Sequence, residues 1–230
     1  MYNYEIYKII KVFDSEDLNT VNKLIGRTTT PDWVDGNVSF RGEEGVKNNL
    51  ELKNNFYLNK IEKITFDALS NNSQYANFTY PKNVEGIIVS KTESGGYYNT
   101  HTDTGNVGHF STTIFLSEKD SYEGGELSLW INGKEEYVKL NPGYAVVYPT
   151  GIPHRVNKVK SGSRIAIVFW TKSILKDPVI LETCRELRSI AIDEKDAYVP
   201  NDEKMQEVLN QWQFKVSNAV NRLVRTYGDI

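Results

Sequence analysis

The chain has 230 residues, of which 39% are hydrophobic and 25% are charged, so it is long enough to bury a core of its own. Its formal net charge is −3, which argues against a surface that binds nucleic acid by neutralising phosphates. The longest apolar run covers residues 165–170 and is too short to cross a bilayer, so we expect no contact with membranes.

Cysteine usage and the first residues of the chain bear on the compartment. Cys184 is the only cysteine, which excludes a disulfide within the chain. Residues 1–5 carry no basic flank and begin no apolar segment of signal-peptide length. We therefore expect a protein of the reducing cytoplasm.

The first 82 residues combine strand and helix patterns. Residues 6–13 predict a strand, and Asp14 or Ser15 offers the N-cap of a helix that runs to Gly26. Residues 33–38 contain a turn within an otherwise β-prone segment. Apolar residues at helical spacing predict a second helix over 54–70, ended by residues 71–73.

From residue 83 onward the pattern changes to short strands separated by turn signals, which is typical of an antiparallel sandwich or barrel. Asn132-Gly133 is the strongest short-range signal for a β-hairpin. The strands that we expect are 87–89, 112–116, 126–131, 135–140, 145–148 and 164–170.

Helical spacing returns after Pro178. An apolar stripe from Met205 to Tyr227 predicts a long helix that Asn201 opens and that packs on the core or forms a homodimer contact. No repeat or linker divides the chain, so we expect a single domain. Its parts are a core over about 83–173, an N-terminal α/β flank over 1–82 and a helical extension over 178–230.

Two histidines and an aspartate form a candidate metal site. His101 and Asp103 lie two residues apart, so in an extended strand their side chains point to the same side. His154 follows Asp103 by 51 residues, directly after an apolar strand. A single His-X-Asp pair is more often a surface feature than a ligand set. Two imidazoles and one carboxylate, however, suffice to hold a divalent iron and leave positions open. The pattern predicts a non-haem iron oxygenase.

Arg164 opens the most apolar strand of the chain. A guanidinium does not lose its proton in proteins, so a buried one requires an anion. Two partners are open at this point. One is an aspartate or glutamate of the chain, and the other is the carboxylate of a ligand, which the planar guanidinium favours. A dicarboxylic keto acid bound to iron at its other end would supply that carboxylate.

Several further runs extend this pattern. They are Tyr98-Asn99-Thr100-His101-Thr102-Asp103, Ser111 through Ser117, Tyr122-Glu123-Gly124-Gly125-Glu126-Leu127, Tyr148-Pro149, His154-Arg155-Val156 and Gly162-Ser163-Arg164 through Trp170. Through these runs the segment 87–173 resembles the Fe(II)/2-oxoglutarate-dependent dioxygenases, specifically the PKHD-type hydroxylases related to prolyl 4-hydroxylases.

This resemblance implies a mainly β fold with flanking α-helices, the double-stranded β-helix or jelly roll. It implies that His101, Asp103 and His154 are the catalytic metal ligands and that Arg164 binds the distal carboxylate of 2-oxoglutarate. Fe(II), 2-oxoglutarate as co-substrate and O2 would be required, with ascorbate as the reductant. Oxidative decarboxylation to succinate and CO2 would be coupled to hydroxylation of an amino-acid side chain. The expected partner is a peptide or protein substrate, with peptidyl proline as the leading choice.

The resemblance also assigns residues around this centre. Tyr98 would lie near the substrate mouth, and Trp170 would flank the metal pocket as a second substrate-binding residue. Thr112 or Thr113 would add a hydroxyl contact to the co-substrate. Many relatives carry a tyrosine nine or ten residues before the first histidine, and it also bonds the distal carboxylate. Lys91 and Thr92 stand there in this chain, so that contact is either lost or replaced by the Lys91 ammonium.

Three alternatives stay open at this point. The chain could be a non-catalytic metabolite-binding jelly roll with a residual metal site, which predicts loss of a ligand or of the arginine, and neither is lost. It could hydroxylate a free amino acid or another small metabolite. It could be a zinc hydrolase, although that function leaves Arg164 without a partner.

Overall fold

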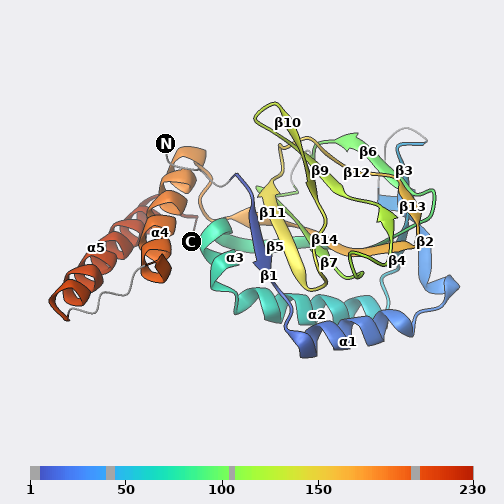
Figure 1. Ribbon diagram of the computed structural model, residues 1–230, viewed down its shortest axis with the longest axis horizontal. Helices are drawn as coiled ribbons and strands as arrows, with labels where there is room; N and C mark the ends of the chain where they lie inside the picture. Colours follow the sequence, from blue (N-terminus) through green and yellow to red (C-terminus); the bar gives the residue numbers. More distant parts are fainter. Residues whose placement is uncertain (1–5, 40–44, 104–106, 198–202, 230) are drawn as a thin grey trace.

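A computed structural model describes residues 6–39, 45–103, 107–197 and 203–229, with the backbone alone described over 190–197. Two β-sheets face each other, helices cover the outer side of the larger sheet, and a pair of C-terminal helices stands to one side (Figure 1). The apolar core is accordingly divided into one cluster beneath the helices and a second cluster between the two sheets.

The larger sheet has seven strands and the smaller sheet has five. In spatial order the larger sheet contains β1 (Lys8–Lys11), β11 (Tyr144–Pro149), β7 (Phe110–Phe115), β14 (Ser163–Ser173), β5 (Pro81–Glu93), β4 (Leu50–Leu52) and β2 (Trp33–Asp35). The smaller sheet contains β10 (Lys134–Val138), β9 (Leu127–Ile131), β12 (His154–Val156), β6 (Tyr97–His101) and β3 (Lys47–Asn48). A short pair, β8 (Glu123–Gly124) and β13 (Val159–Ser161), completes the strands of the described residues. Two facing antiparallel sheets of this kind are the expected double-stranded β-helix.

Strand β14 shows why the larger sheet is buried on both faces. Successive side chains of a strand point to opposite sides. Phe169 packs edge-on against Tyr75 of the helical layer, with ring centroids 6.5 Å apart. Arg164 points to the other side, where its guanidinium lies 5.1 Å from the centre of the Phe115 ring. The apolar run of this strand is therefore explained by two cores rather than one.

Three helices make the outer layer, and side-chain caps start each of them. They are α1 (Ser15–Gly26), α2 (Phe56–Ser70) and α3 (Ser73–Thr79). Asp14 accepts hydrogen bonds from the backbone N–H groups of Glu16 and Asp17, which confirms the predicted start of the first helix. The predicted second helix is confirmed with Asn55 as its cap. Helix α3 was not expected.

The hairpin between β9 and β10 is confirmed at the predicted turn. Asn132 and Gly133 have φ angles of 50° and 76°, as a type I′ turn requires at both central residues. Asparagine tolerates this left-handed region better than most residues, and glycine adopts it freely.

Two C-terminal helices, α4 (Pro178–Ala197) and α5 (Glu203–Tyr227), pack against each other to one side of the sheets (Figure 1). Cys184 of α4 and Val220 of α5 are buried in the core cluster beneath the helices, so part of the apolar stripe of α5 packs on the core. Asn201, the predicted start of the last helix, lies outside the described residues. Phe214 and Val208 of α5 are exposed, so the homodimer contact through this helix stays a prediction. Among the described residues, no helix has both the length and the apolar character needed to cross a membrane.

Replacing Tyr75 by phenylalanine is expected to destabilise the fold. The Tyr75 and Thr171 hydroxyl groups share a buried hydrogen bond of 2.7 Å between helix α3 and strand β14. Its loss leaves the Thr171 hydroxyl buried without a partner, which costs about 1–3 kcal/mol in the free energy of unfolding. Urea unfolding measures this, with Tyr144→Phe on the accessible side of β11 as the matched control. Equal unfolding midpoints for both variants would contradict the assignment.

Candidate active site

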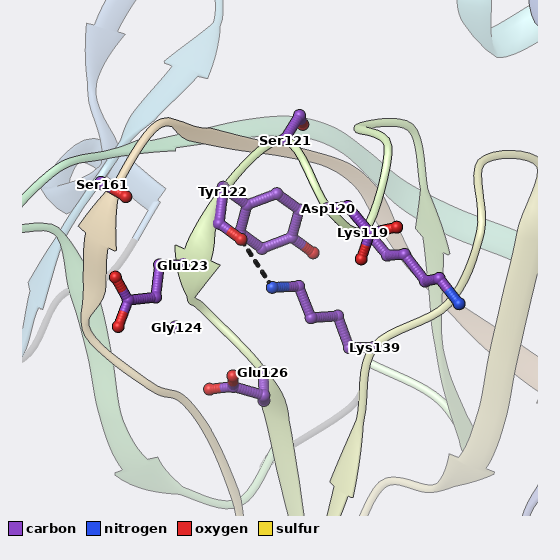
Figure 2. A pocket seen from close by; sticks show the side chains of 9 residues that line it. All are labelled: Lys119, Asp120, Ser121, Tyr122, Glu123, Gly124, Glu126, Lys139 and Ser161. Atoms are coloured by element: carbon purple, nitrogen blue, oxygen red, sulfur yellow. Dashed lines mark hydrogen bonds between the residues drawn. The ribbon is translucent and has the colours of Figure 1, made fainter.

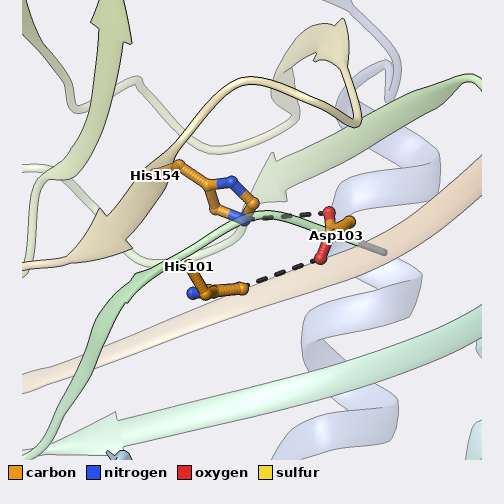
Figure 3. A group of neighbouring side chains, drawn as sticks. All are labelled: His101, Asp103 and His154. Carbon is orange, nitrogen blue, oxygen red and sulfur yellow. Dashed lines mark ion pairs between the residues drawn. The ribbon is translucent and has the colours of Figure 1, made fainter. Parts of the chain in front are cut away.

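Three side chains predicted as metal ligands come together between the sheets. His101 ends β6 and lies directly opposite His154 at the start of β12, so their ring centroids are 4.2 Å apart. Asp103 follows two residues later, with its carboxylate oxygens 3.8 Å from His101 Nε2 and 3.7 Å from His154 Nε2 (Figure 3). One candidate ligand atom from each residue lies within 4.8 Å of the others.

Backbone carbonyls fix the orientation of both imidazoles. His101 Nδ1 lies 2.8 Å from the Asn99 carbonyl oxygen, and His154 Nδ1 lies 2.9 Å from that of Ile152. Because a carbonyl only accepts, each Nδ1 carries the proton, and each Nε2 presents its lone pair toward Asp103. Such carbonyl contacts set the tautomer that a metal ligand needs.

Burial keeps one of these imidazoles neutral. Desolvation, followed by the charge of the neighbouring His154, lowers the pKa of His101 to about 4. Only 16% of the His101 side chain and 7% of the His154 side chain are exposed. A neutral imidazole is the form that binds a metal, so His101 is ready for that role at neutral pH.

Tyr98 holds His101 in place, and Ser111 holds Asp103. The Ser111 hydroxyl donates a hydrogen bond to Asp103 Oδ2. The Tyr98 ring stacks on His101, with centroids 3.8 Å apart and planes inclined by 19°. Burial, followed by the charge of Asp103, raises the pKa of Tyr98 to about 12, so the phenol stays protonated.

Arg164 is a buried cation without a counter-ion among the described residues. It is 2% exposed, and its Nε and Nη2 atoms have no hydrogen-bond partner within the described part of the chain. Burial lowers its pKa, although an arginine in a protein stays charged. An unpaired charge in such a place is costly, and an incoming anion would remove that cost. The sequence left open an ion pair between Arg164 and an aspartate or glutamate of the chain. No such pair is present among the described residues.

Tyr148 connects the two halves of the site. It is buried, and its ring lies edge-on to His154 with centroids 5.2 Å apart. Burial and then the charge of Asp103 raise its pKa well above the usual value, while hydrogen bonds with Thr113 and Ser111 and the charge of Arg164 act in the opposite direction. Its hydroxyl is thus close to both the candidate metal ligands and the buried cation.

The prediction that Thr112 contacts the co-substrate is wrong. Thr112 lies opposite Phe169 of β14, and Phe169 packs against Tyr75, so this pair faces the helices. Thr113, which the sequence offered as the alternative, faces the inter-sheet space, where it bonds to Tyr148.

The Lys91 assignment is also wrong. Arg164 lies opposite Thr92 of β5, so the side chain of Lys91 points to the other face of the larger sheet. There the Lys91 ammonium is 2.5 Å from the Glu93 carboxylate and 5.6 Å from the centre of the Trp33 ring. The residue that shares the side of Arg164 is Thr92.

Trp170 lies on the same face of the larger sheet as Ser111, which is its partner in β7. Its indole Nε1 is buried without a hydrogen-bond partner among the described residues. The third histidine, His109, has a structural contact, because its Nδ1 accepts a hydrogen bond from the Ser173 backbone N–H at 2.9 Å.

Comparison with known proteins decides the family. Residues 87–172 match the 2OG-Fe(II) oxygenase superfamily. A PKHD-type hydroxylase of Prochlorococcus marinus (strain MIT 9301) is 33% identical over 177 residues, which cover 74% of this chain and 79% of the relative. A PKHD-type hydroxylase of Thermosynechococcus vestitus is 32% identical, covering 80% of this chain and 86% of the relative. The chain is a PKHD-type hydroxylase of the 2OG-Fe(II) oxygenase superfamily.

Solved structures agree on the fold of this hydroxylase. A Pseudomonas putida prolyl-4-hydroxylase superposes with a TM-score of 0.54 at 16% identity, covering 73% of this chain and 92% of the other. A Trichoplax adhaerens prolyl hydroxylase in complex with a hypoxia inducible factor peptide fragment gives 0.54 at 18% identity, with 80% and 88% covered.

Membership of this family implies that the hydroxylase uses Fe(II), 2-oxoglutarate and O2. The side chains fit that set. Two imidazole Nε2 atoms and one carboxylate converge as a candidate iron-binding group. The buried Arg164 has donors available for the second carboxylate of 2-oxoglutarate.

Proposed function

We propose that His101, Asp103 and His154 hold Fe(II) in this hydroxylase and that Arg164 binds the distal carboxylate of 2-oxoglutarate. The observation that carries this proposal is the guanidinium of Arg164, which is 2% exposed and has unpaired donors within the described residues. A cation in that state calls for an anionic ligand, and 2-oxoglutarate has one carboxylate for the metal and another for the arginine.

Iron held by these three side chains would, with 2-oxoglutarate and O2, supply the oxidising chemistry that converts the keto acid to succinate and CO2 and hydroxylates the substrate. The protein contributes orientation and exclusion of water. The carbonyls of Asn99 and Ile152 keep the two Nε2 lone pairs facing Asp103. Tyr148 and Leu129 belong to the apolar cluster between the sheets and lie against His154, so they form an apolar wall beside this centre.

We further propose that the hydroxylated group is a prolyl side chain in a peptide or protein. The names of similar proteins support this proposal, because the P. putida structure is a prolyl-4-hydroxylase and the T. adhaerens structure contains a peptide fragment. We assign Tyr98 and Trp170 to substrate binding, since Tyr98 stacks on His101 and Trp170 lies opposite Ser111.

The proposal is tested by incubating the protein with Fe(II), ascorbate as the proposed reductant, and 2-oxoglutarate. Succinate should form, and a proline-containing peptide should gain the mass of one oxygen. A matched peptide with alanine in place of proline is the control. Absence of succinate under all conditions would refute the activity. Equal oxidation of the alanine peptide, or oxidation only of free amino acids, would refute the substrate.

Replacing Ser111 by alanine is expected to weaken metal binding without removing a ligand. The Ser111 hydroxyl donates to Asp103 Oδ2, and loss of such a supporting contact typically costs about 10- to 100-fold in metal affinity or activity. Calorimetric titration of the metal-free protein with Fe(II) under anaerobic conditions measures the loss. Ser161→Ala, at an exposed position, serves as the control. Unchanged affinity in Ser111→Ala would show that the contact has no role in the metal site.

A further inference from the structure

The phenol of Tyr122 is buried in an unusual state. Tyr122 is 5% exposed, and its hydroxyl has no hydrogen-bond partner among the described residues. A buried hydroxyl left unpaired costs about 1–3 kcal/mol. The fold therefore keeps a polar group in its interior that no described side chain satisfies.

The ring of Tyr122 is held firmly in place. Lys139 Nζ donates a 2.8 Å hydrogen bond to the Tyr122 backbone carbonyl, and the same ammonium lies 3.9 Å from the centre of the ring (Figure 2). Neither contact involves the hydroxyl, and together they fix the ring on one side. Tyr122 and Lys139 also line the surface pocket drawn in Figure 2.

Tyr122 and Arg164 meet at Gly125. A methyl group added at Gly125 would lie 3.0 Å from Tyr122 Cε2 and 3.3 Å from Arg164 Cδ. Gly125 has a φ angle of +66°, so both its conformation and the lack of a side chain permit this approach. The charge of Arg164 also acts against the burial that raises the pKa of Tyr122, as expected for neighbours.

Three buried donors of this region therefore lack partners among the described residues, namely Nε and Nη2 of Arg164 and the hydroxyl of Tyr122. The other nearby phenol, Tyr148, already bonds to Thr113 and Ser111. A carboxylate offers about four lone-pair sites, so it can accept two N–H groups from a guanidinium and still accept an O–H.

We infer that the Tyr122 hydroxyl is a second donor to the carboxylate that Arg164 binds. The phenol and the guanidinium together then select keto acids that carry a second carboxylate. This inference rests on the proposed function, since it takes the distal carboxylate of 2-oxoglutarate as the ligand. It assigns Tyr122 a part in co-substrate recognition rather than in the hydroxylated substrate.

The variant Tyr122→Phe tests this inference, because it removes the hydroxyl and keeps the ring. Calorimetry on the Fe(II)-loaded protein without O2 gives the affinities for 2-oxoglutarate and for pyruvate, a 2-oxo acid without the distal carboxylate. We expect the 2-oxoglutarate affinity to fall about 10- to 100-fold and the pyruvate affinity to stay the same. Tyr137→Phe, on the exposed face of β10, is the matched control and should change neither affinity.

A second readout needs no co-substrate. Since the hydroxyl has no partner among the described residues, Tyr122→Phe should unfold at the same or a higher denaturant concentration than the wild type. An unchanged 2-oxoglutarate affinity, an equal loss for both keto acids, or a destabilised free protein would each overturn the inference. Failure of the proposed function appears differently, because then Arg164→Met also leaves the 2-oxoglutarate affinity unchanged.

Discussion

Replacing Arg164 by methionine is expected to weaken 2-oxoglutarate binding and to stabilise the free protein at the same time. In the complex, the guanidinium would face a carboxylate in a dry interior. Truncating one member of a buried hydrogen-bonded charge pair costs about 2–5 kcal/mol, which corresponds to roughly 30-fold to several thousand-fold in affinity. Metal binding should persist, because the candidate ligand group consists of His101, Asp103 and His154 and does not include Arg164.

The stabilising effect has the opposite sign for a physical reason. Without a ligand, Arg164 is 2% exposed and has two nitrogen atoms unpaired among the described residues. Methionine fills much of the same volume beside Phe115 and removes the buried charge. Replacing buried ionic groups by well-packed apolar residues is often neutral or stabilising by 1–4 kcal/mol, so about that gain is expected here.

Calorimetry with 2-oxoglutarate and urea unfolding of the free protein measure the two effects. Arg155→Met is the matched control, since the Arg155 side chain is 36% exposed and bonds to Glu135 at 2.7 Å. It should leave the 2-oxoglutarate affinity unchanged. An Arg164→Met protein that binds 2-oxoglutarate as tightly as the wild type would refute the assignment of the co-substrate site.

Replacing His154 by alanine is expected to abolish turnover. The change removes one of two imidazoles whose Nε2 atoms face Asp103, so the remaining set no longer encloses a metal ion. The loss should exceed the roughly 10- to 100-fold effect of losing an outer contact such as Ser111. Succinate formation and anaerobic Fe(II) titration are the measurements.

His109→Ala is the matched control for this variant. His109 supports the backbone of Ser173 and lies outside the candidate ligand group of the described residues. This control should lose stability and keep Fe(II) affinity. Turnover by His154→Ala at the wild-type rate would place the iron somewhere else.

The candidate metal ligands could be predicted from the sequence because two of them obey a local rule. His101 and Asp103 share a side of the chain by spacing alone, and the return of His154 follows from the antiparallel pairing of β6 with β12. The Asn132-Gly133 hairpin is likewise a local property, since its positive φ angles depend on those two residues.

The predicted co-substrate contacts of Thr112 and Lys91 are wrong because they depend on strand pairing between residues that are distant in sequence. Thr112 and Thr113 are both plausible within one strand, and only the register against β14 decides which of them faces the metal side. The spacing of Lys91 from His101 predicts a contact with the co-substrate. The pairing of β5 with β14, however, decides to which face of the sheet its side chain points. A shift of one residue in the register moves every side chain of a strand to the opposite face of the sheet.

Helix α3 was missed for a related reason. Asn72 follows the end of the preceding helix and also accepts a hydrogen bond from the Tyr75 backbone N–H, so it starts the next helix. Polar residues of this type are typical both of turns and of helix starts, and the sequence does not separate the two. The packing of Tyr75 and Phe78 on the larger sheet settles the choice.

The candidate iron ligands and the arginine belong to different sheets. His101 and His154 come from strands of the smaller sheet, whereas Arg164 and Ser111 come from strands of the larger one. In the proposed binding mode, a keto acid held at both ends would therefore span the two layers of the fold, and the spacing of those layers would limit how many carbons the acid can contain. Packing between the sheets, far from any reacting atom, would thereby help to determine which acid the enzyme consumes.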